Sequence, residues 1–555
     1  MCGILPADVP KASDGKLFWL LFLLLVAAVT ARAQNVLTWH NDNARTGQNL
    51  KETQLKPSNV TYPTFGLLFV LAVDGTVDAQ PLYMADVTIT GLGGQVRHNV
   101  VFVATEHDSV YAFDADTGAR LWQVSMLKPG ESPSDDRGCN SISPEIGVTA
   151  TPVIVPISGP HGTIYVVAMS KDGSGNYYQR LHALDITSGK EEFGGPVEIQ
   201  AKFPGTGDNS LNGYVLFDPG QYMDRPGLLV VGQNVYTAWS SHCDERPYTG
   251  WVIGYDLSTL AQSHVLNVTP NGNQGAIWSS GAGMAADDSG YIYFLDANGT
   301  FDTQLDARGF PSEGDFGNGF LKLNPELKVV DYFNMYNTVR ESDIDDDLGS
   351  GGALVVPPMK DADGKTRYLV VGAGKDTIIY LADRNNMGKF NPNNKGNIYQ
   401  EVTQVGSVEG LGDGVWGAPA FFNNVLYYGA QSDVIRAFRF SNAMLLSTPI
   451  STTSIPFEYP GATPSISAAG DSDGILWALE NINPGVLHAY DARDLSVELY
   501  NSNQAGSRDH FGNGNKFITP TIAGGKVYVA TTSGVGVFGF LRNSTESEKL
   551  PPTRK

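Results

Sequence analysis

The stretch VFVATEHDSVYAFDADTGARLWQ, from Val101 to Gln123, decides the fold class. Apolar residues alternate with other residues in two successive runs, a period of two that is typical of half-buried β-strands. The turn after the second run contains Asp116-Thr117-Gly118, where glycine supplies the positive φ that a side chain resists. A Leu-Trp pair follows the turn. By itself, the stretch predicts one β-hairpin of an all-β protein.

The same strand–loop–strand pattern recurs along the chain. We count eight copies, which begin at Val101, Gly162, Asn234, Gly290, Arg367, Asn424, Gly474 and Lys526. A repeated supersecondary unit buries its core only by stacking against its neighbours. The repeat therefore predicts one domain, in place of the three or four domains that 555 residues otherwise suggest.

Short apolar strands that open with proline precede most copies. The dipeptides concerned are Gln80-Pro81, Thr151-Pro152, Arg225-Pro226, Ala418-Pro419, Thr463-Pro464 and Thr519-Pro520. Proline lacks the N–H that a central strand donates to its neighbour, but an inner edge strand tolerates it. An inner edge strand beside an open axis is the innermost strand of a propeller blade.

The two ends of the repeat indicate how the ring closes. FGLLFVLAV (Phe65–Val73) has no blade of its own, and the last copy ends at Phe540 without an outer strand. Pairing the two removes an exposed edge. We therefore predict an all-β fold, a single eight-bladed β-propeller of four-stranded antiparallel blades closed by an N-terminal strand. The predicted boundaries are a signal peptide (1–33), an N-terminal extension (34–64), the propeller (65–541) and a polar tail (542–555).

The first 33 residues have the pattern of an export signal. Lys11 and Lys16 precede an apolar run from Leu17 to Val29, and Ala31-Arg32-Ala33 is an A-x-A cleavage pattern. The run is shorter than the ~20 residues of a membrane-spanning helix, with an uncleaved anchor as the alternative. We expect an extracytoplasmic protein, periplasmic or secreted, with no stable membrane span after cleavage near Ala33.

The formal net charge of −21 argues against a nucleic-acid partner, which requires a basic surface. We expect a monomer whose partner is an unknown protein, polymer or small molecule. Of the three cysteines, Cys2 leaves with the signal, so Cys139 and Cys243 remain. In an oxidising compartment such a pair predicts a disulfide, and two buried thiols are the alternative.

The Asp-x-x-Thr/Ser-Gly turns followed by Leu-Trp resemble the repeat of the pyrroloquinoline quinone (PQQ) dehydrogenase family and its non-catalytic relatives. The segment WHNDNARTGQN (Trp39–Asn49) also resembles the segment that opens those propellers. The resemblance implies a quinone over a calcium ion, on the face formed by the loops that enter each blade and by the middle loops. Cys139 and Cys243 fall on this face in neighbouring blades.

Four residues match the dehydrogenase pattern. The resemblance places the quinone-contacting cation at Lys375, the calcium-ligand asparagine at Asn298 and the catalytic aspartate at Asp345. It also places Trp278 where a tryptophan stacks under the quinone ring. A cation would stabilise the oxyanion of a reduced quinone, and a carboxylate would take the alcohol proton.

Each of these four residues has a purely structural alternative. Lys375 is equally compatible with a hairpin turn in water, and Asn298 before Gly299 is an ordinary turn pair. The cluster Asp343–Asp347 is compatible with a solvated acidic loop or a calcium site, and Trp278 with packing between blades.

The chain also departs from the dehydrogenase pattern. The vicinal cysteine pair is missing, and so is the calcium-ligand glutamate, for which Glu145 is the only nearby substitute. No Cys-x-x-Cys-His motif is present to attach a haem. These departures favour an exported binding or scaffold protein that acts through its loop-rich face, with no certain cofactor. The alternative is a PQQ- and calcium-dependent quinoprotein dehydrogenase that oxidises alcohols or sugars.

Overall fold

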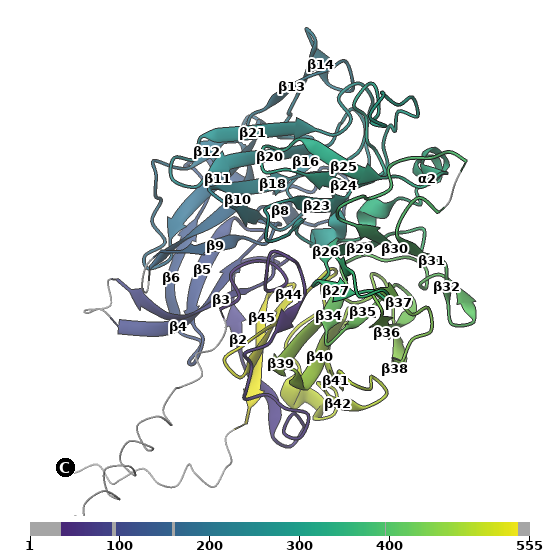
Figure 1. Ribbon diagram of the computed structural model, residues 1–555. Helices are drawn as coiled ribbons and strands as arrows, with labels where there is room; N and C mark the ends of the chain where they lie inside the picture. Colours follow the sequence, from purple (N-terminus) through teal and green to yellow (C-terminus); the bar gives the residue numbers. More distant parts are fainter. Residues whose placement is uncertain (1–34, 91–95, 158–160, 394–395, 542–555) are drawn as a thin grey trace, which may run out of the picture.

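The computed structural model describes residues 35–90, 96–157, 161–393 and 396–541 (Figure 1). The predicted signal peptide and the polar tail lie outside the described residues. Within these ranges the only α-helix is α2 (Thr338–Ile344), and the short 3-10 helices are η1 (Ser279–Gly281), η2 (Leu348–Ser350) and η3 (Gly506–Asp509). The all-β fold class is confirmed. No described helix has the length and apolar character to cross a membrane.

Eight antiparallel sheets of four main strands follow one another along the described chain. The first is β3 (Leu82–Ile89), β4 (Val96–Ala104), β5 (Ser109–Asp114) and β6 (Arg120–Ser125). The second is β9 (Val153–Pro156), β10 (Gly162–Asp172), β11 (Tyr177–Asp185) and β12 (Val197–Glu198). The third is β17 (Leu229–Val231), β18 (Asn234–Ala238), β20 (Trp251–Asp256) and β21 (Gln262–Asn267). The fourth is β22 (Ala285–Ala286), β23 (Ile292–Leu295), β24 (Phe320–Leu323) and β25 (Val329–Phe333).

The second half of the chain continues the same order. The fifth sheet is β26 (Leu354–Val355), β29 (Leu369–Ala373), β30 (Ile379–Asp383) and β31 (Gln400–Val402). The sixth is β34 (Ala420–Phe422), β35 (Val425–Tyr428), β36 (Asp433–Ser441) and β38 (Ser451–Phe457). The seventh is β39 (Ser465–Ala469), β40 (Ser472–Glu480), β41 (Val486–Asp491) and β42 (Glu498–Asn501). The eighth is β43 (Thr521–Ala523), β44 (Lys526–Thr531), β45 (Gly534–Phe540) and β2 (Phe65–Ala72).

Shorter strands decorate these sheets. Those paired with a main sheet are β1 (Gln48–Asn49), β7 (Glu131–Asp135), β8 (Glu145–Ile146) and β37 (Met444–Leu445). The others are β13 (Lys202–Pro204), β14 (Ser210–Leu211), β15 (Tyr214–Leu216), β16 (Tyr222–Met223), β19 (Ser240–Ser241), β27 (Met359–Lys360), β28 (Thr366–Arg367), β32 (Gln404–Val405) and β33 (Val408–Glu409).

The repeat motif joins each sheet to the next one. In the turn after β5, Asp114 Oδ1 accepts hydrogen bonds from the backbone N–H groups of Asp116 and Thr117. The side chain of Trp122 in β6 reaches the second sheet, where its Nε1 donates to the carbonyl of Ile186, directly after β11, at 3.0 Å. A Cβ at Gly189 would lie only 2.9 Å from the Trp122 ring. The glycine of this turn therefore makes room for the aromatic residue of the sheet before it.

The eighth sheet contacts the first sheet in the same way. The N-terminal strand β2 pairs with β45 from Phe65 opposite Phe540 to Ala72 opposite Gly534, and Figure 1 shows purple β2 beside yellow β45. A Cβ at Gly118, in the first sheet, would lie 2.9 Å from the ring of Phe69 in β2. The predicted pairing of β2 with the last repeat is thus present in the structure.

The apolar core lies between successive sheets. Separate clusters of buried side chains join the first and second sheets, the second and third, and so on to the sixth and seventh. One further cluster combines the seventh, eighth and first sheets. Each sheet is therefore buried on both faces, which explains why few described β-strands alternate cleanly between apolar and polar residues.

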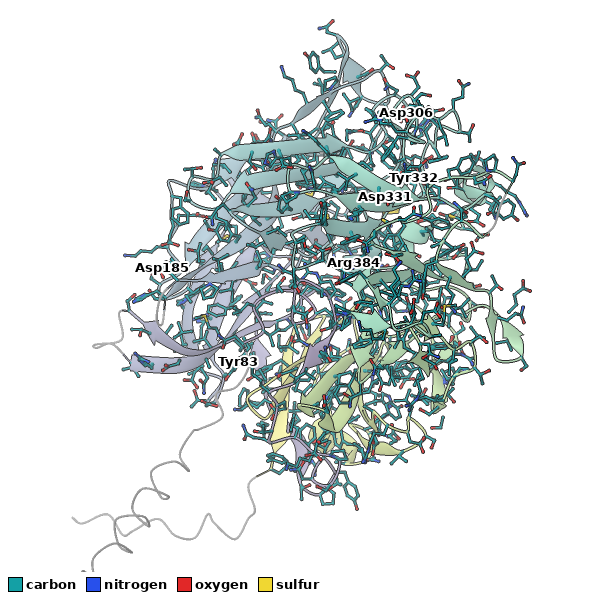
Figure 2. The ribbon with its side chains drawn as sticks, in the orientation of Figure 1. Tyr83, Asp185, Asp306, Asp331, Tyr332 and Arg384 are labelled. Atoms are coloured by element: carbon teal, nitrogen blue, oxygen red, sulfur yellow. A yellow bond between two sulfur atoms is a disulfide. The ribbon has the colours of Figure 1, made fainter. Side chains whose placement is uncertain are left out.

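The N-terminal segment, defined here as Val36–Asn49, contacts the first strand of every sheet. Its hydrogen bonds join Val36 to Tyr83, Leu37 to Ile154, Asn43 to Val230 and Ala286, Ala44 to Val355, Thr46 to Phe421, Gly47 to Ile466 and Asn49 to Ile522. Tyr83, the first of these partners, is labelled in Figure 2. A segment this short reaches all eight strands only if those strands lie around a common centre.

Candidate functional site

A cavity of about 400 Å³ lies among the loops of the second to eighth sheets. The sequence-predicted residues Trp278, Asn298, Asp345 and Lys375 all line it, together with the two cysteines. The rest of the lining is Ser141, Met223, Ser240, Ser241, Asp244, Ala276, Ala297, Asp347, Trp416, Tyr459 and Lys516. The structure therefore brings together residues that are up to 377 positions apart, from Cys139 to Lys516.

Cys139 and Cys243 form a disulfide, with their Cα atoms 5.6 Å apart. Cys139 follows β7 of the second sheet, and Cys243 follows β19 in the middle loop of the third sheet. The predicted bridge is present. It ties two loops together at the wall of the cavity.

Lys375 holds two carboxylates at the cavity wall. It lies in the turn between β29 and β30, and its Nζ is 2.5 Å from Asp345 Oδ1 and 2.7 Å from Asp347 Oδ1. Its backbone N–H also donates to the carbonyl of Asp347, at 2.9 Å, which fixes the turn against that loop. Asp345 follows α2 in a left-handed conformation, with φ of 65°, and 64% of its side chain is exposed.

Asp347 is the buried member of this group, with only 1% of its side chain exposed. Burial raises its pKa to about 6, although the charge of Lys375 opposes the shift. Burial lowers the pKa of Lys375, but the charges of Asp347 and Asp345 outweigh this and raise it to about 12. A carboxylate with a pKa near the working pH is suited to proton transfer. Asp347, rather than the sequence-predicted Asp345, is therefore the better candidate for a general base.

Asn298 follows β23 and joins this group from the fourth sheet. Its Nδ2 donates to Asp345 Oδ1 at 2.5 Å, and its carbonyl accepts from the N–H of Gly275 at 2.6 Å. Its Oδ1 has no hydrogen-bond partner in the described part of the chain. Nearby, burial raises the pKa of Asp296 well above its ordinary value.

Aromatic rings form the other walls. Trp278 meets the ring of Phe517 edge to face at 5.7 Å, and Trp416 meets Tyr459 in the same manner at 5.8 Å. Tyr459 in turn contacts Phe517, at 6.1 Å between ring centroids. Trp278 thus lines the cavity, although the sequence left packing between blades open for it.

Glu145 takes no part in this arrangement. Its Oε1 lies 2.9 Å from His107 Nδ1, and it is not among the residues that line the cavity. The residues described here contain no group of three or more His, Cys, Asp or Glu side chains arranged to hold a metal ion. The carboxylates of Asp345 and Asp347 are instead occupied by the ammonium group of Lys375.

The residues that line the cavity thus fit a quinone better than a calcium ion. A flat quinone fits the cavity, because Trp278, the disulfide and the cation Lys375 all face it. A calcium ion, which prefers several oxygen ligands, fits less well, because the ammonium group of Lys375 already lies 2.5 and 2.7 Å from the carboxylates of Asp345 and Asp347.

Sequence reasoning missed Asp347, Asp244, Trp416, Tyr459 and Lys516. Asp347 was within the acidic cluster, but only burial distinguishes it from its neighbours. Trp416, Tyr459 and Lys516 stand shortly before Pro419, Pro464 and Pro520, in the loops that enter three blades. Aromatic or basic residues just before those prolines were the signal that could have found them.

Comparisons with known proteins agree with this fold. The family model described as "Outer membrane protein assembly factor BamB" matches residues 43–192 and 106–238. No curated protein sequence matches the chain.

Three solved structures share the fold. A quinohemoprotein alcohol dehydrogenase from Comamonas testosteroni is 15% identical, with a TM-score of 0.58, over 94% of this chain and 82% of that one. The quinohemoprotein alcohol dehydrogenase ADHIIG from Pseudomonas putida HK5 is 14% identical, with a TM-score of 0.57, over 99% and 85%. A europium-containing methanol dehydrogenase is 13% identical, with a TM-score of 0.58, over 93% and 100%.

These likenesses place the chain among proteins with the PQQ-type β-propeller fold. Over residues 43–238 the chain resembles the PQQ-type β-propeller repeat family, as the Asp-x-x-Thr/Ser-Gly turns indicated. At such low identity the solved structures show the fold alone, so the activity of this chain has to be argued from its own residues.

Proposed function

We propose that the eight sheets are the blades of one closed ring and that the protein binds a small molecule in the cavity on its loop-rich face. Three observations support the ring: the pairing of β2 with β45, the packing of Phe69 on Gly118, and an N-terminal segment that contacts all eight first strands. A ring of this kind has no open sheet edge between its first and last blades.

The observation that carries the binding function is the convergence of separate loops on one cavity. Its volume of about 400 Å³ is that of a small-molecule site, and it combines aromatic walls with a few polar groups. Two of its ionised groups, Asp347 and Lys375, lie 2.7 Å apart and both have shifted pKa values, which is typical of functional sites. A flat scaffold surface would require neither feature.

The test is a binding screen with the mature protein. Neutral sugars, sugar acids and PQQ are titrated while tryptophan fluorescence and the unfolding temperature are recorded. We expect at least one class to bind, and we expect Trp278→Ala and Lys375→Met to weaken that binding at least tenfold. Lys202→Met, an exposed lysine of β13, is the matched control and leaves affinity unchanged. Absence of binding by all three classes, or equal affinity in all variants, would contradict the proposal.

A quinone-dependent oxidoreductase is the second candidate, and Asp347 is the observation that favours it. When bound, a quinone supplies a two-electron acceptor. Asp347, with its pKa near 6, is suited to take the proton of a substrate hydroxyl, and Lys375 holds that carboxylate in place. Trp278 and the disulfide would restrict water around the ring.

This candidate is tested by loading the protein with PQQ, with and without calcium, and recording the absorption spectrum and alcohol-dependent dye reduction. The oxidoreductase candidate requires quinone absorbance and a turnover that Asp347→Asn abolishes, while Asp343→Asn, which changes an exposed aspartate of the neighbouring helix α2, retains it. No dye reduction by loaded protein would remove this candidate and leave the binding function.

We further propose that the protein acts outside the cytoplasm, as a monomer. The Cys139–Cys243 disulfide supports an oxidising compartment, and the net charge of −21 disfavours nucleic acid as a partner.

A further inference from the structure

Of the two lysines that line the cavity, Lys516 is the one without a carboxylate partner among the described residues. It lies in the loop that enters the eighth sheet, and its side chain lines the cavity while being half-buried. Within the residues that the structure describes, its ammonium group makes no hydrogen bond or ion pair. Its Nζ lies 5.8 Å from the centroid of the Phe517 ring.

A second cation lies on the same aromatic ring. Arg225 stacks over Phe517 with its guanidinium carbon 4.7 Å from the ring centroid, and it is fully buried. Arg225 pairs with the buried carboxylate of Asp78, at 3.5 Å. The charge of Asp78 also acts on Lys516, against the effects of burial and of Arg225. Asp78 therefore forms its ion pair with Arg225 and leaves Lys516 without one.

The acid beside Asp78, Glu106, does not balance the positive charges of Arg225 and Lys516. Burial and the charge of Asp78 raise the pKa of Glu106 well above its ordinary value, which favours its uncharged form. Burial, together with the charge of Arg225, lowers the pKa of Lys516, so its charge costs free energy that an anion would recover. This part of the wall is positive, although the protein as a whole carries a charge of −21.

The rest of the wall is suited to a hydroxylated ring. Trp278, Trp416 and Tyr459 contribute aromatic rings to the lining, and Ser240, Ser241 and Asn298 contribute polar side chains. The single positive charge of Lys375 already forms ion pairs with Asp345 and Asp347, so Lys375 is not free to bind an anion.

We propose that the cavity selects a sugar acid, a hydroxylated ring that carries a carboxylate, and that Lys516 binds that carboxylate. This inference rests on the proposed small-molecule function and specifies its ligand. A charge-assisted hydrogen bond from lysine to carboxylate in a half-buried site is strong enough to dominate the choice between an acid and its neutral analogue.

The experiment compares D-glucuronate with D-glucose by isothermal titration calorimetry, on the mature protein. We expect glucuronate to bind at least tenfold more tightly than glucose. Lys516→Gln removes this preference, and Lys516→Arg, which keeps the charge, retains most of it. Lys202→Gln is the control for a lysine outside the cavity, and the unfolding temperature of each variant checks that it folds.

Three outcomes overturn the inference: equal binding of the two sugars, a preference that persists in Lys516→Gln, or no binding of glucuronate at all. In the first two outcomes the cavity still binds a small molecule, so the proposed function stands without the sugar acid. If PQQ and both sugars leave fluorescence and unfolding temperature unchanged, the proposed function fails as well.

Discussion

Two regions of the molecule differ in whether their charged side chains have hydrogen-bond partners: the N-terminal segment and the cavity. In the N-terminal segment, fully buried Arg45 donates to Thr38 Oγ1 and to the carbonyls of Trp39 and Met284, at 2.7, 2.7 and 2.8 Å. In the cavity, the ammonium group of Lys516 makes no such contact with any described residue. Satisfied donors stabilise a fold, whereas unmatched ones are retained where a ligand supplies the partner.

The titratable groups show the same difference. Both ring nitrogens of His40 contact backbone carbonyls, those of Arg45 and Pro464, and burial lowers its pKa to about 4, so it is uncharged at neutral pH. Burial raises the pKa of Asp347, which is equally buried, to about 6, and the ammonium group of Lys375 lies 2.7 Å from its Oδ1. The N-terminal segment is therefore built for stability, and the cavity holds groups that can change their protonation state.

The largest effect is expected from removing the N-terminal segment and β2 together. A chain that begins at Asp74 leaves β45 with an unpaired edge and the eight first strands without their shared partner. We expect aggregation and no cooperative unfolding transition, measured by light scattering and circular dichroism. Val70→Lys, which alters an exposed side chain of β2, is the control and should unfold normally. A monomeric truncated chain with an unchanged melting temperature would contradict the closed ring.

The next effect concerns the disulfide at the cavity. The bridge spans 104 residues, so the chain-entropy model gives it up to about 4.7 kcal/mol of stability. Cys139→Ser with Cys243→Ser should lower the free energy of unfolding by up to that amount, measured in guanidinium chloride. Thiol titration of the denatured, unreduced mature protein should find no free thiol. Two titratable thiols would show that the bridge is not formed in solution.

A matched pair of substitutions compares the two regions directly. Arg45→Met leaves several buried carbonyls without a donor and should cost about 3 to 4 kcal/mol. Lys516→Met removes a partly desolvated charge without a partner and should change stability by no more than about 0.5 kcal/mol. Equal losses in the two variants, measured by denaturant unfolding, would mean that Lys516 is structural.

The smallest effect is the pH dependence that Asp347 contributes. Its pKa in the folded protein is about 6, above the ordinary value of 3.8, so the folded state binds more protons than the unfolded state between these values. Its contribution is therefore present below pH 4 and is lost as pH rises through 6. Two pKa units correspond to about 2.7 kcal/mol.

Asp347→Asn tests this contribution, because it should flatten the fall in unfolding free energy between pH 4 and pH 6. Asp343→Asn, which changes an exposed aspartate of the neighbouring helix α2, should leave the slope unchanged. If both variants keep the wild-type slope, Asp347 titrates as an ordinary carboxyl group and is not a poised base.

Much of the architecture could be predicted because its signals are local. The alternation in Val101–Gln123, the Thr-Gly turn and the repeated proline-led strands each depend on neighbouring residues alone. The pairing of Phe65–Val73 with the last repeat followed from the cost of an open sheet edge. Resemblance to the PQQ-type repeat then selected Trp278, Asn298, Asp345 and Lys375, and all four meet at one cavity.

Only the tertiary structure decided how the charges of that cavity are arranged. Asp345 and Asp347 are equivalent in the sequence, but the fold exposes one and buries the other, and burial sets the pKa. Glu145 was a plausible metal ligand, yet its loop directs it to His107. The surroundings of Lys516 are set by Arg225 and Asp78, whose charges act on it although they are hundreds of residues away in the chain. Sequence patterns specify strands and turns through short-range geometry, whereas pKa and charge matching depend on which distant groups exclude water together.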